Sequence, residues 1–141
     1  MFYKPMLLPL LAMVLLTFMV WFYLFARRIP EILRSDFDMR DLQDRERAHG
    51  LMPRSAAASN NLKNLFELPV LFYAAVLLSL LLMIQDSTLV LLSWAFVAFR
   101  YAHSLIHCTY NNVNHRFAVY VISCLFLLLI WIRMGTFILL H

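Results

Sequence analysis

Ionisable and amide side chains interrupt two apolar stretches of this chain at helical spacing. Their members are Lys63, Asn64 and Glu67 in one stretch and Arg100, His103 and His107 in the other. Steps of three and four residues place each group on one face of a helix. A charged group at the centre of a bilayer costs about 2.5–3.5 kcal/mol on insertion scales, so such a cluster is a site hypothesis.

Cations outnumber carboxylates around these two groups. The further basic and phenolic side chains that we expect at the same end of the helices are Arg27, Arg28, Tyr110, His115 and Arg116. Several cations around one mouth suit an anionic ligand, and arginine in particular binds carboxylates through two parallel hydrogen bonds. The residue types therefore predict a pocket for a small organic anion.

Two other interpretations use the same residues. Glu67 and Arg100 could form an intramembrane ion pair, with Asn64 and His103 as hydrogen-bonding partners between helices. His103 and His107 could also bind a metal ion or haem from one helical face. No further histidine or carboxylate stands at ligand spacing beside them, so we expect no metal.

The elements that position these residues are membrane spans. The chain has 141 residues, 63% of them hydrophobic, and a mean hydropathy of +0.75. This composition leaves too little polar surface for a soluble globule. We predict a single domain over 1–141 and spans at about 6–26, 62–84, 88–110 and 117–139, with a loop at about 27–61.

Short connections and charge distribution predict the topology. Residues 85–87 and 111–115 are tight turns, so consecutive spans are antiparallel in an all-α, up-down four-helix bundle. Seven arginines lie in the 27–61 loop, which places that loop in the cytosol and both termini on the non-cytoplasmic side. The same loop carries six acidic residues, which argues against nucleic acid as a partner.

Four motifs resemble the MAPEG superfamily, the membrane-associated proteins of eicosanoid and glutathione metabolism. They are Phe25-Ala26-Arg27-Arg28, Asn64-Leu65-Phe66-Glu67-Leu68-Pro69, Arg100-Tyr101-Ala102-His103 and Arg116. Each motif is short, but their order and spacing across four spans are specific. The segments 66–73 and 103–107 are similar to an uncharacterised bacterial branch.

The resemblance implies a homotrimer that binds glutathione between neighbouring subunits near the cytosolic face. It implies a role in glutathione binding for Arg27, Lys63, Asn64, Glu67, Arg100, His103, His107 and Tyr110. Glu67 would face the amino group of glutathione. Arg116, and after it Arg28, would lie near the sulfur and stabilise the thiolate as catalytic residues.

Two positions depart from the pattern of the eicosanoid enzymes. His107 stands where they carry tyrosine, and Lys63 replaces an arginine.

The composition and the resemblance together predict an integral protein of a bacterial inner membrane with glutathione as co-substrate. Its activity would be that of a transferase or peroxidase acting on lipophilic small molecules or lipid hydroperoxides. The alternative is a non-catalytic membrane scaffold whose charges fix helix packing or dock a partner.

Overall fold

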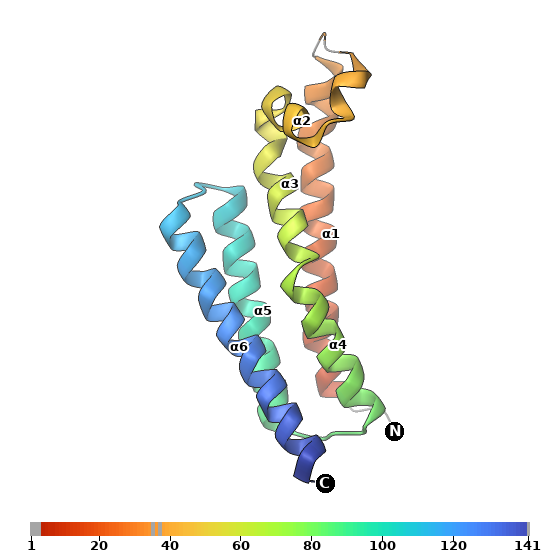
Figure 1. Ribbon diagram of the computed structural model, residues 1–141, viewed down its shortest axis with the longest axis vertical. Helices are drawn as coiled ribbons and strands as arrows, with labels where there is room; N and C mark the ends of the chain where they lie inside the picture. Colours follow the sequence, from red (N-terminus) through yellow and green to blue (C-terminus); the bar gives the residue numbers. More distant parts are fainter. Residues whose placement is uncertain (1–3, 35, 37, 141) are drawn as a thin grey trace.

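The computed structural model of the chain describes residues 4–34, 36 and 38–140, and every regular element in that part is helical (Figure 1). The elements are α1 (Lys4–Leu33), the short 3₁₀ helix η1 (Met39–Leu42), α2 (Arg45–Leu51), α3 (Pro53–Leu65), α4 (Leu68–Leu81), α5 (Ser87–Cys108) and α6 (Val113–Leu140). Four helical rods, with α3 and α4 counted as one, are long and apolar enough to cross a membrane.

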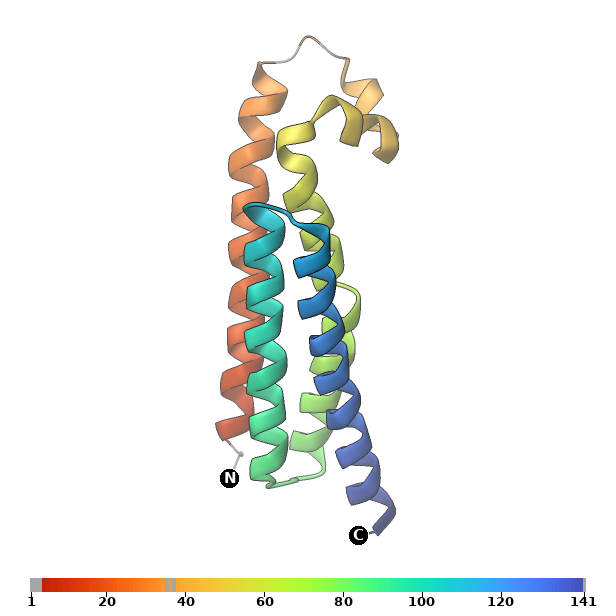
Figure 2. The same ribbon diagram turned by 90° about the vertical axis from the view of Figure 1, so that its left-hand side faces the viewer.

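The four rods run up and down, as the short connections predict. In Figure 1, α1 and the α3–α4 rod stand beside each other, and α5 and α6 form a second antiparallel pair. Figure 2 shows α5 in front of α1, with both ends of the chain at the end opposite to α2. The predicted all-α, four-span architecture is therefore confirmed.

Helices extend into the segment that we expected to be a loop. α1 continues to Leu33, and α3 begins at Pro53, so much of 27–61 is helical. The end of an apolar run marks where a helix leaves the hydrocarbon, and charged residues beyond that point are good helix formers. Hydropathy therefore locates the membrane boundary but not the end of the helix.

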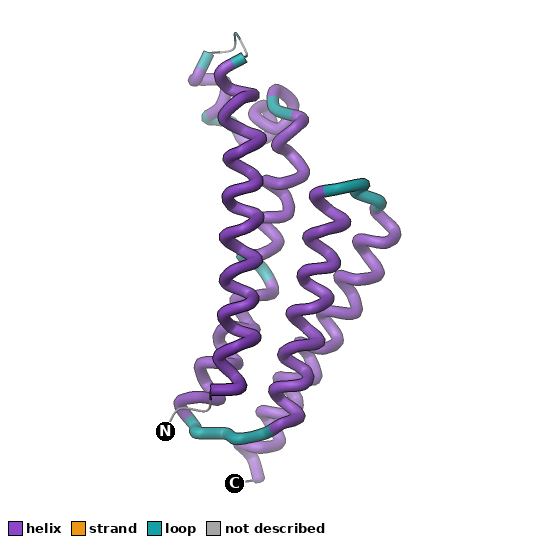
Figure 3. Tube along the Cα trace, turned by 180° about the vertical axis from the view of Figure 1, so that it is seen from behind, coloured by secondary structure: helices purple, strands orange, loops and turns teal. Residues whose placement is uncertain are grey.

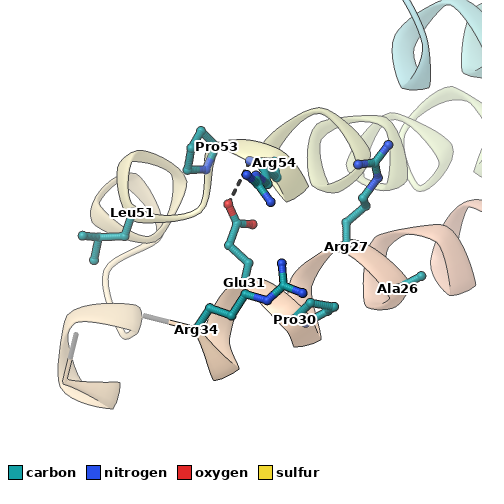
Figure 4. Close-up of a pocket in the computed structure, with 8 residues that line it drawn as sticks. All are labelled: Ala26, Arg27, Pro30, Glu31, Arg34, Leu51, Pro53 and Arg54. Carbon is teal, nitrogen blue, oxygen red and sulfur yellow. Dashed lines mark hydrogen bonds between the residues drawn. The ribbon is translucent and has the colours of Figure 1, made fainter. Parts of the chain in front are cut away.

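Glu31 of α1 caps the N-terminus of α3. Proline occupies the first position of α3, and the preceding Met52 makes no side-chain capping bond. The two carboxylate oxygens of Glu31 instead accept hydrogen bonds from the backbone N–H of Arg54 at 2.9 Å (Figure 4) and from the backbone N–H of Ser55 at 3.1 Å. A negative charge at a helix N-terminus is also favoured by the helix dipole. This contact fixes the end of α1 against the start of α3.

The core lies along one face of each rod, and the opposite faces stay apolar. Met13 and Val20 of α1 are buried, whereas Phe18 and Phe22 on the same helix are exposed. Between rods, Phe72 and Phe96 stack with their ring centroids 4.8 Å apart. Exposed leucine and phenylalanine side chains on the outer faces are what a helix in lipid presents.

The end of the bundle that carries the chain termini is closed by Asp86. Its Oδ1 accepts the backbone N–H of Thr88 at 2.8 Å, which caps α5, and its Oδ2 accepts from Nε of Arg133 on α6 at 2.7 Å. Partial burial alone would raise the pKa of the Asp86 carboxyl. The hydrogen bonds from Arg133 and Thr88 and the charge of Arg133 nevertheless hold this pKa below its ordinary value.

We expect the Asp86–Arg133 ion pair to contribute stability that disappears in acid. A carboxyl with a lowered folded-state pKa stabilises the fold above its ordinary pKa of about 4 and loses that contribution as the pH falls below it. Asp86→Asn keeps a good helix cap and removes the charge, so it should cost about 0.2–1 kcal/mol at pH 7.

Thermal unfolding in detergent between neutral and acidic pH measures this effect. The difference in stability between wild type and Asp86→Asn should close as the pH falls below about 4. Asp86→Ala should cost about 1 kcal/mol more than Asp86→Asn, because it also removes the cap. A difference between wild type and Asp86→Asn that is independent of pH would contradict the ion-pair account.

Candidate functional site

The polar stripe on α5 is buried inside the chain. Arg100 is 0% exposed, His103 2% and His107 3%, and they face α3 and α6 rather than lipid. Ser104 lies on the same buried face. The helical spacing of these residues therefore predicted their common face correctly, and packing has turned that face toward protein, as the cost of a charge in lipid requires.

A break between α3 and α4 supplies the partner of Arg100. Pro69 has no N–H to donate, so the regular ladder of hydrogen bonds cannot continue through this point. The interruption is visible as the short loop-coloured piece within the α3–α4 rod in Figure 3. Nη2 of Arg100 donates to the backbone carbonyl of Asn64, near the end of α3, at 3.1 Å. The guanidinium thus binds the negative end of a helix dipole.

The ion pair between Glu67 and Arg100, one of the alternatives that the sequence left open, does not form between these two described side chains. Lys63 and Glu67 are exposed on the outer face of α3 and the break, and Asn64 is half-buried. The inward-facing polar residue of α3 is Asn61, which is 0% exposed. The interpretation of Arg100 and Glu67 as partners within one chain was therefore wrong. Pro69 ends α3 before the predicted stripe reaches Glu67.

Asn61 joins α3 to α5 through two side-chain hydrogen bonds. Its Oδ1 accepts from Oγ of Ser104 at 3.2 Å, and its Nδ2 donates to Sγ of Cys108 at 3.4 Å. The sequence patterns did not single out Asn61 or Ser104 as members of this cluster. The spacing of Ser104 and Cys108, four residues apart on α5, was the available signal.

Arg116 is held beside His107 at the start of α6. Its Nη1 donates to Oδ1 of Asn111 at 2.7 Å and lies 3.3 Å from Nε2 of His107. A guanidinium only donates, so Nε2 of His107 is the acceptor and that imidazole is neutral. Tyr120, one turn further along α6, lies 5.9 Å from the guanidinium of Arg100 and was not predicted.

The two arginines at the end of the first span have different environments. Nε of Arg27 donates to the hydroxyl of Tyr23 at 3.1 Å, and that hydroxyl donates to the carbonyl of Cys108 at 3.2 Å. Arg28 is half-buried, and its Nε is enclosed without an acceptor in the described residues. Tyr110 lies apart from both in the exposed α5–α6 connection, where its hydroxyl contacts Nδ1 of His115 at 3.1 Å.

Several buried polar nitrogens of this cluster have no hydrogen-bond partner in the described part of the chain. They are Nε and Nη1 of Arg100, Nε of Arg28 and Nδ1 of His103 and of His107. An unpaired buried polar group costs about 1–3 kcal/mol, and charged groups cost more. No set of three histidine, cysteine, aspartate or glutamate side chains in the described residues is arranged to hold a metal ion. The chemistry on offer is that of hydrogen-bond donors around an anion.

Comparison with known proteins identifies the family of the chain. Residues 6–136, nearly the whole chain, match the profile of the MAPEG family. The chain belongs to the MAPEG family. Members of this family generally use glutathione. Searches of characterised proteins and of solved structures gave no match.

The MAPEG match spans all four rods and includes every residue that we assigned to the site. In this MAPEG protein those residues fall into three groups: Arg27 and Arg28 on α1, Lys63, Asn64 and Glu67 around the break, and Arg100, His103, His107 and Arg116 between α5 and α6. Tyr110 lies outside them. The role of each residue toward glutathione stays a prediction.

Proposed function

We propose that this protein binds glutathione at the end of the bundle that carries the α5–α6 connection and activates its thiol for attack on lipophilic molecules. The observation that supports this most is Arg100, which is fully buried with two donors free of any acceptor in the described residues. A bound carboxylate would accept a hydrogen bond from Arg100 and neutralise its charge. Glutathione, which members of the MAPEG family generally use, carries two such carboxylates.

The charges around the break fit the charges of glutathione. Glutathione carries two carboxylates, one ammonium group and one thiol. Lys63 and Arg100 supply cations for the carboxylates, and Glu67 supplies the anion for the ammonium. Arg116, anchored by His107 and Asn111, is our first candidate for stabilising the thiolate, and Arg28 is the second.

The chemistry would take one of two forms. In conjugation, the thiolate sulfur forms a bond to an electrophilic carbon, and the leaving group departs with the bonding electron pair. In peroxide reduction, two glutathione molecules are oxidised to the disulfide while a lipid hydroperoxide is reduced to an alcohol and water. The electrophile of the first reaction and the hydroperoxide of the second would reach the site from the bilayer, where lipophilic molecules concentrate.

The outer face of α3 carries charged side chains that need to be shielded from lipid. Lys63 and Glu67 are exposed on the single chain, beside the apolar residues that span the membrane. Charges at that depth need protein or ligand around them. We therefore propose that a second copy packs over this face in a homotrimer, with glutathione between neighbours. Both termini would be on the non-cytoplasmic side of a bacterial inner membrane, so that the site faces cytosolic glutathione.

Calorimetric titration of the detergent-purified protein with glutathione tests the proposal. We expect saturable binding that Glu67→Gln weakens by about 10- to 100-fold, since a hydrogen bond to a charged group is worth about 1.5–3 kcal/mol. Glu46→Gln, which removes an exposed carboxylate from α2, is the matched control and should bind like wild type. Absence of binding at millimolar glutathione would refute the proposal.

A second candidate function is that of a non-catalytic scaffold. The bond from Arg100 to the Asn64 carbonyl and the Asn61 contacts tie helices together, which is what a purely structural cluster would do. The two functions predict different ionisation states of the glutathione thiol. An enzyme should show the ultraviolet absorbance of a glutathione thiolate at neutral pH, whereas a scaffold should show none.

A further inference from the structure

A pocket of about 560 Å³ lies where the end of α1 meets the start of α3, away from the α5 cluster. It is lined by Ala26, Arg27, Pro30, Glu31, Arg34, Leu51, Pro53 and Arg54. Figure 4 shows Arg27 extending from α1 toward α3, Arg34 lying beside Glu31 just past the end of α1, and Arg54 beside Glu31 at the start of α3. Three arginines and one carboxylate thus line the same pocket.

The carboxylate in this pocket, Glu31, already accepts hydrogen bonds, whereas the guanidinium groups of two of the arginines donate none within the described residues. Both oxygens of Glu31 accept backbone N–H groups of α3, so its charge is directed at the helix terminus. The guanidinium groups of Arg34 and Arg54 make no hydrogen bond or ion pair within the part of the chain that the structure describes. Arg27 uses only its Nε, on Tyr23. Most of the arginine donors therefore remain for a ligand.

The position of the pocket along the membrane normal favours a lipid headgroup as the anion that it binds. About 20 helical residues at about 1.5 Å each cross a hydrocarbon core of about 30 Å. Counted from Met6, the core ends near Phe25, which leaves the pocket-lining part of α1 at the level of the headgroups. Ile29 and Leu33, on the same turns, are 50% and 80% exposed, as residues in contact with lipid would be.

We propose that this pocket binds the phosphate diester of an anionic phospholipid headgroup. Arginine forms two parallel hydrogen bonds to phosphate oxygens. Arg34, just past the end of α1, and Arg54 of α3 line the same pocket. The exposed side chain of Leu51 at the rim gives the glycerol and first acyl carbons an apolar contact. A bound lipid would thereby bridge α1 and α3 beside the Glu31 cap. The proposal does not depend on glutathione binding.

Native mass spectrometry of the full-length protein in a neutral detergent tests the proposal. The probes are phosphatidylglycerol and phosphatidylcholine with identical acyl chains. The test variant is Arg34→Gln/Arg54→Gln, which leaves the backbone N–H of Arg54 to Glu31 intact and spares Arg27, a candidate glutathione ligand. The control is Arg40→Gln/Arg47→Gln, which removes the same charge from exposed positions outside this pocket.

We expect wild type and the control variant to bind phosphatidylglycerol at least tenfold more tightly than phosphatidylcholine, and the test variant to lose that preference. Thermal unfolding of the same samples establishes that each variant is folded. Equal losses in both variants would show diffuse attraction by a basic segment and overturn the proposal. Binding of glycerol 3-phosphate as tightly as phosphatidylglycerol would overturn the lipid assignment, because the site would then hold a soluble phosphate.

Discussion

Replacing Arg116 with alanine should abolish the ultraviolet absorbance of bound glutathione thiolate and lower the rate of conjugation by about 10²-fold or more. Asn111 and His107 hold one nitrogen of this guanidinium at 2.7 Å and 3.3 Å, so its remaining donors are presented in a defined direction. A thiolate next to a fixed positive charge is stabilised relative to the thiol. The charge of Arg116 is therefore the quantity that the substitution removes.

Stopped-flow absorbance with glutathione and turnover of an aryl halide measure the two effects of Arg116→Ala. Arg116→Lys keeps a charge without the planar fork and should retain part of both signals. Arg40→Ala, at an exposed position of η1, is the control and should be unaffected. If Arg116→Ala kept the thiolate absorbance of wild type, Arg116 would not be the residue that stabilises the thiolate, and Arg28 would be the next candidate.

Arg100→Met should stabilise the ligand-free protein while it removes glutathione binding. Two buried donors of Arg100 have no acceptor in the described residues, and each such group costs about 1–3 kcal/mol. The substitution loses a single hydrogen bond to the Asn64 carbonyl, worth about 0.5–1.5 kcal/mol, and that carbonyl still accepts the backbone N–H of Glu67 at 3.4 Å. Methionine fills much of the same volume with apolar atoms.

The net expectation for Arg100→Met is a gain of about 1–3 kcal/mol in the free energy of unfolding without glutathione. Unfolding in mixed detergent micelles, with and without glutathione, measures both effects. Asn61→Leu is the contrasting variant. The hydrogen-bonding groups of Asn61 are paired, so its loss leaves Ser104 unsatisfied and should lower stability. Destabilisation by Arg100→Met together with intact glutathione binding would favour the scaffold function.

The sequence alone determined the number of spans, their alternation and the family. These features depend on local quantities: runs of about 20 apolar residues, turns too short for anything but antiparallel neighbours, and short motifs in a fixed order. The common buried face of Arg100, His103 and His107 also followed from spacing, because a continuous helix repeats every 3.6 residues.

Tertiary structure decided which residues face one another. Asn61, and neither Lys63 nor Glu67, turns inward on α3, because Pro69 ends that helix and the rotation of a rod about its axis is set by packing. Glu31 caps α3 from 23 residues away, a contact that no local pattern encodes. Arg100 donates to a backbone carbonyl and not to the carboxylate of Glu67, which one interpretation of the sequence paired with it. Sequence spacing cannot predict this hydrogen bond, because every residue carries a backbone carbonyl. Only the break between α3 and α4 leaves the carbonyl of Asn64 accessible to a side chain.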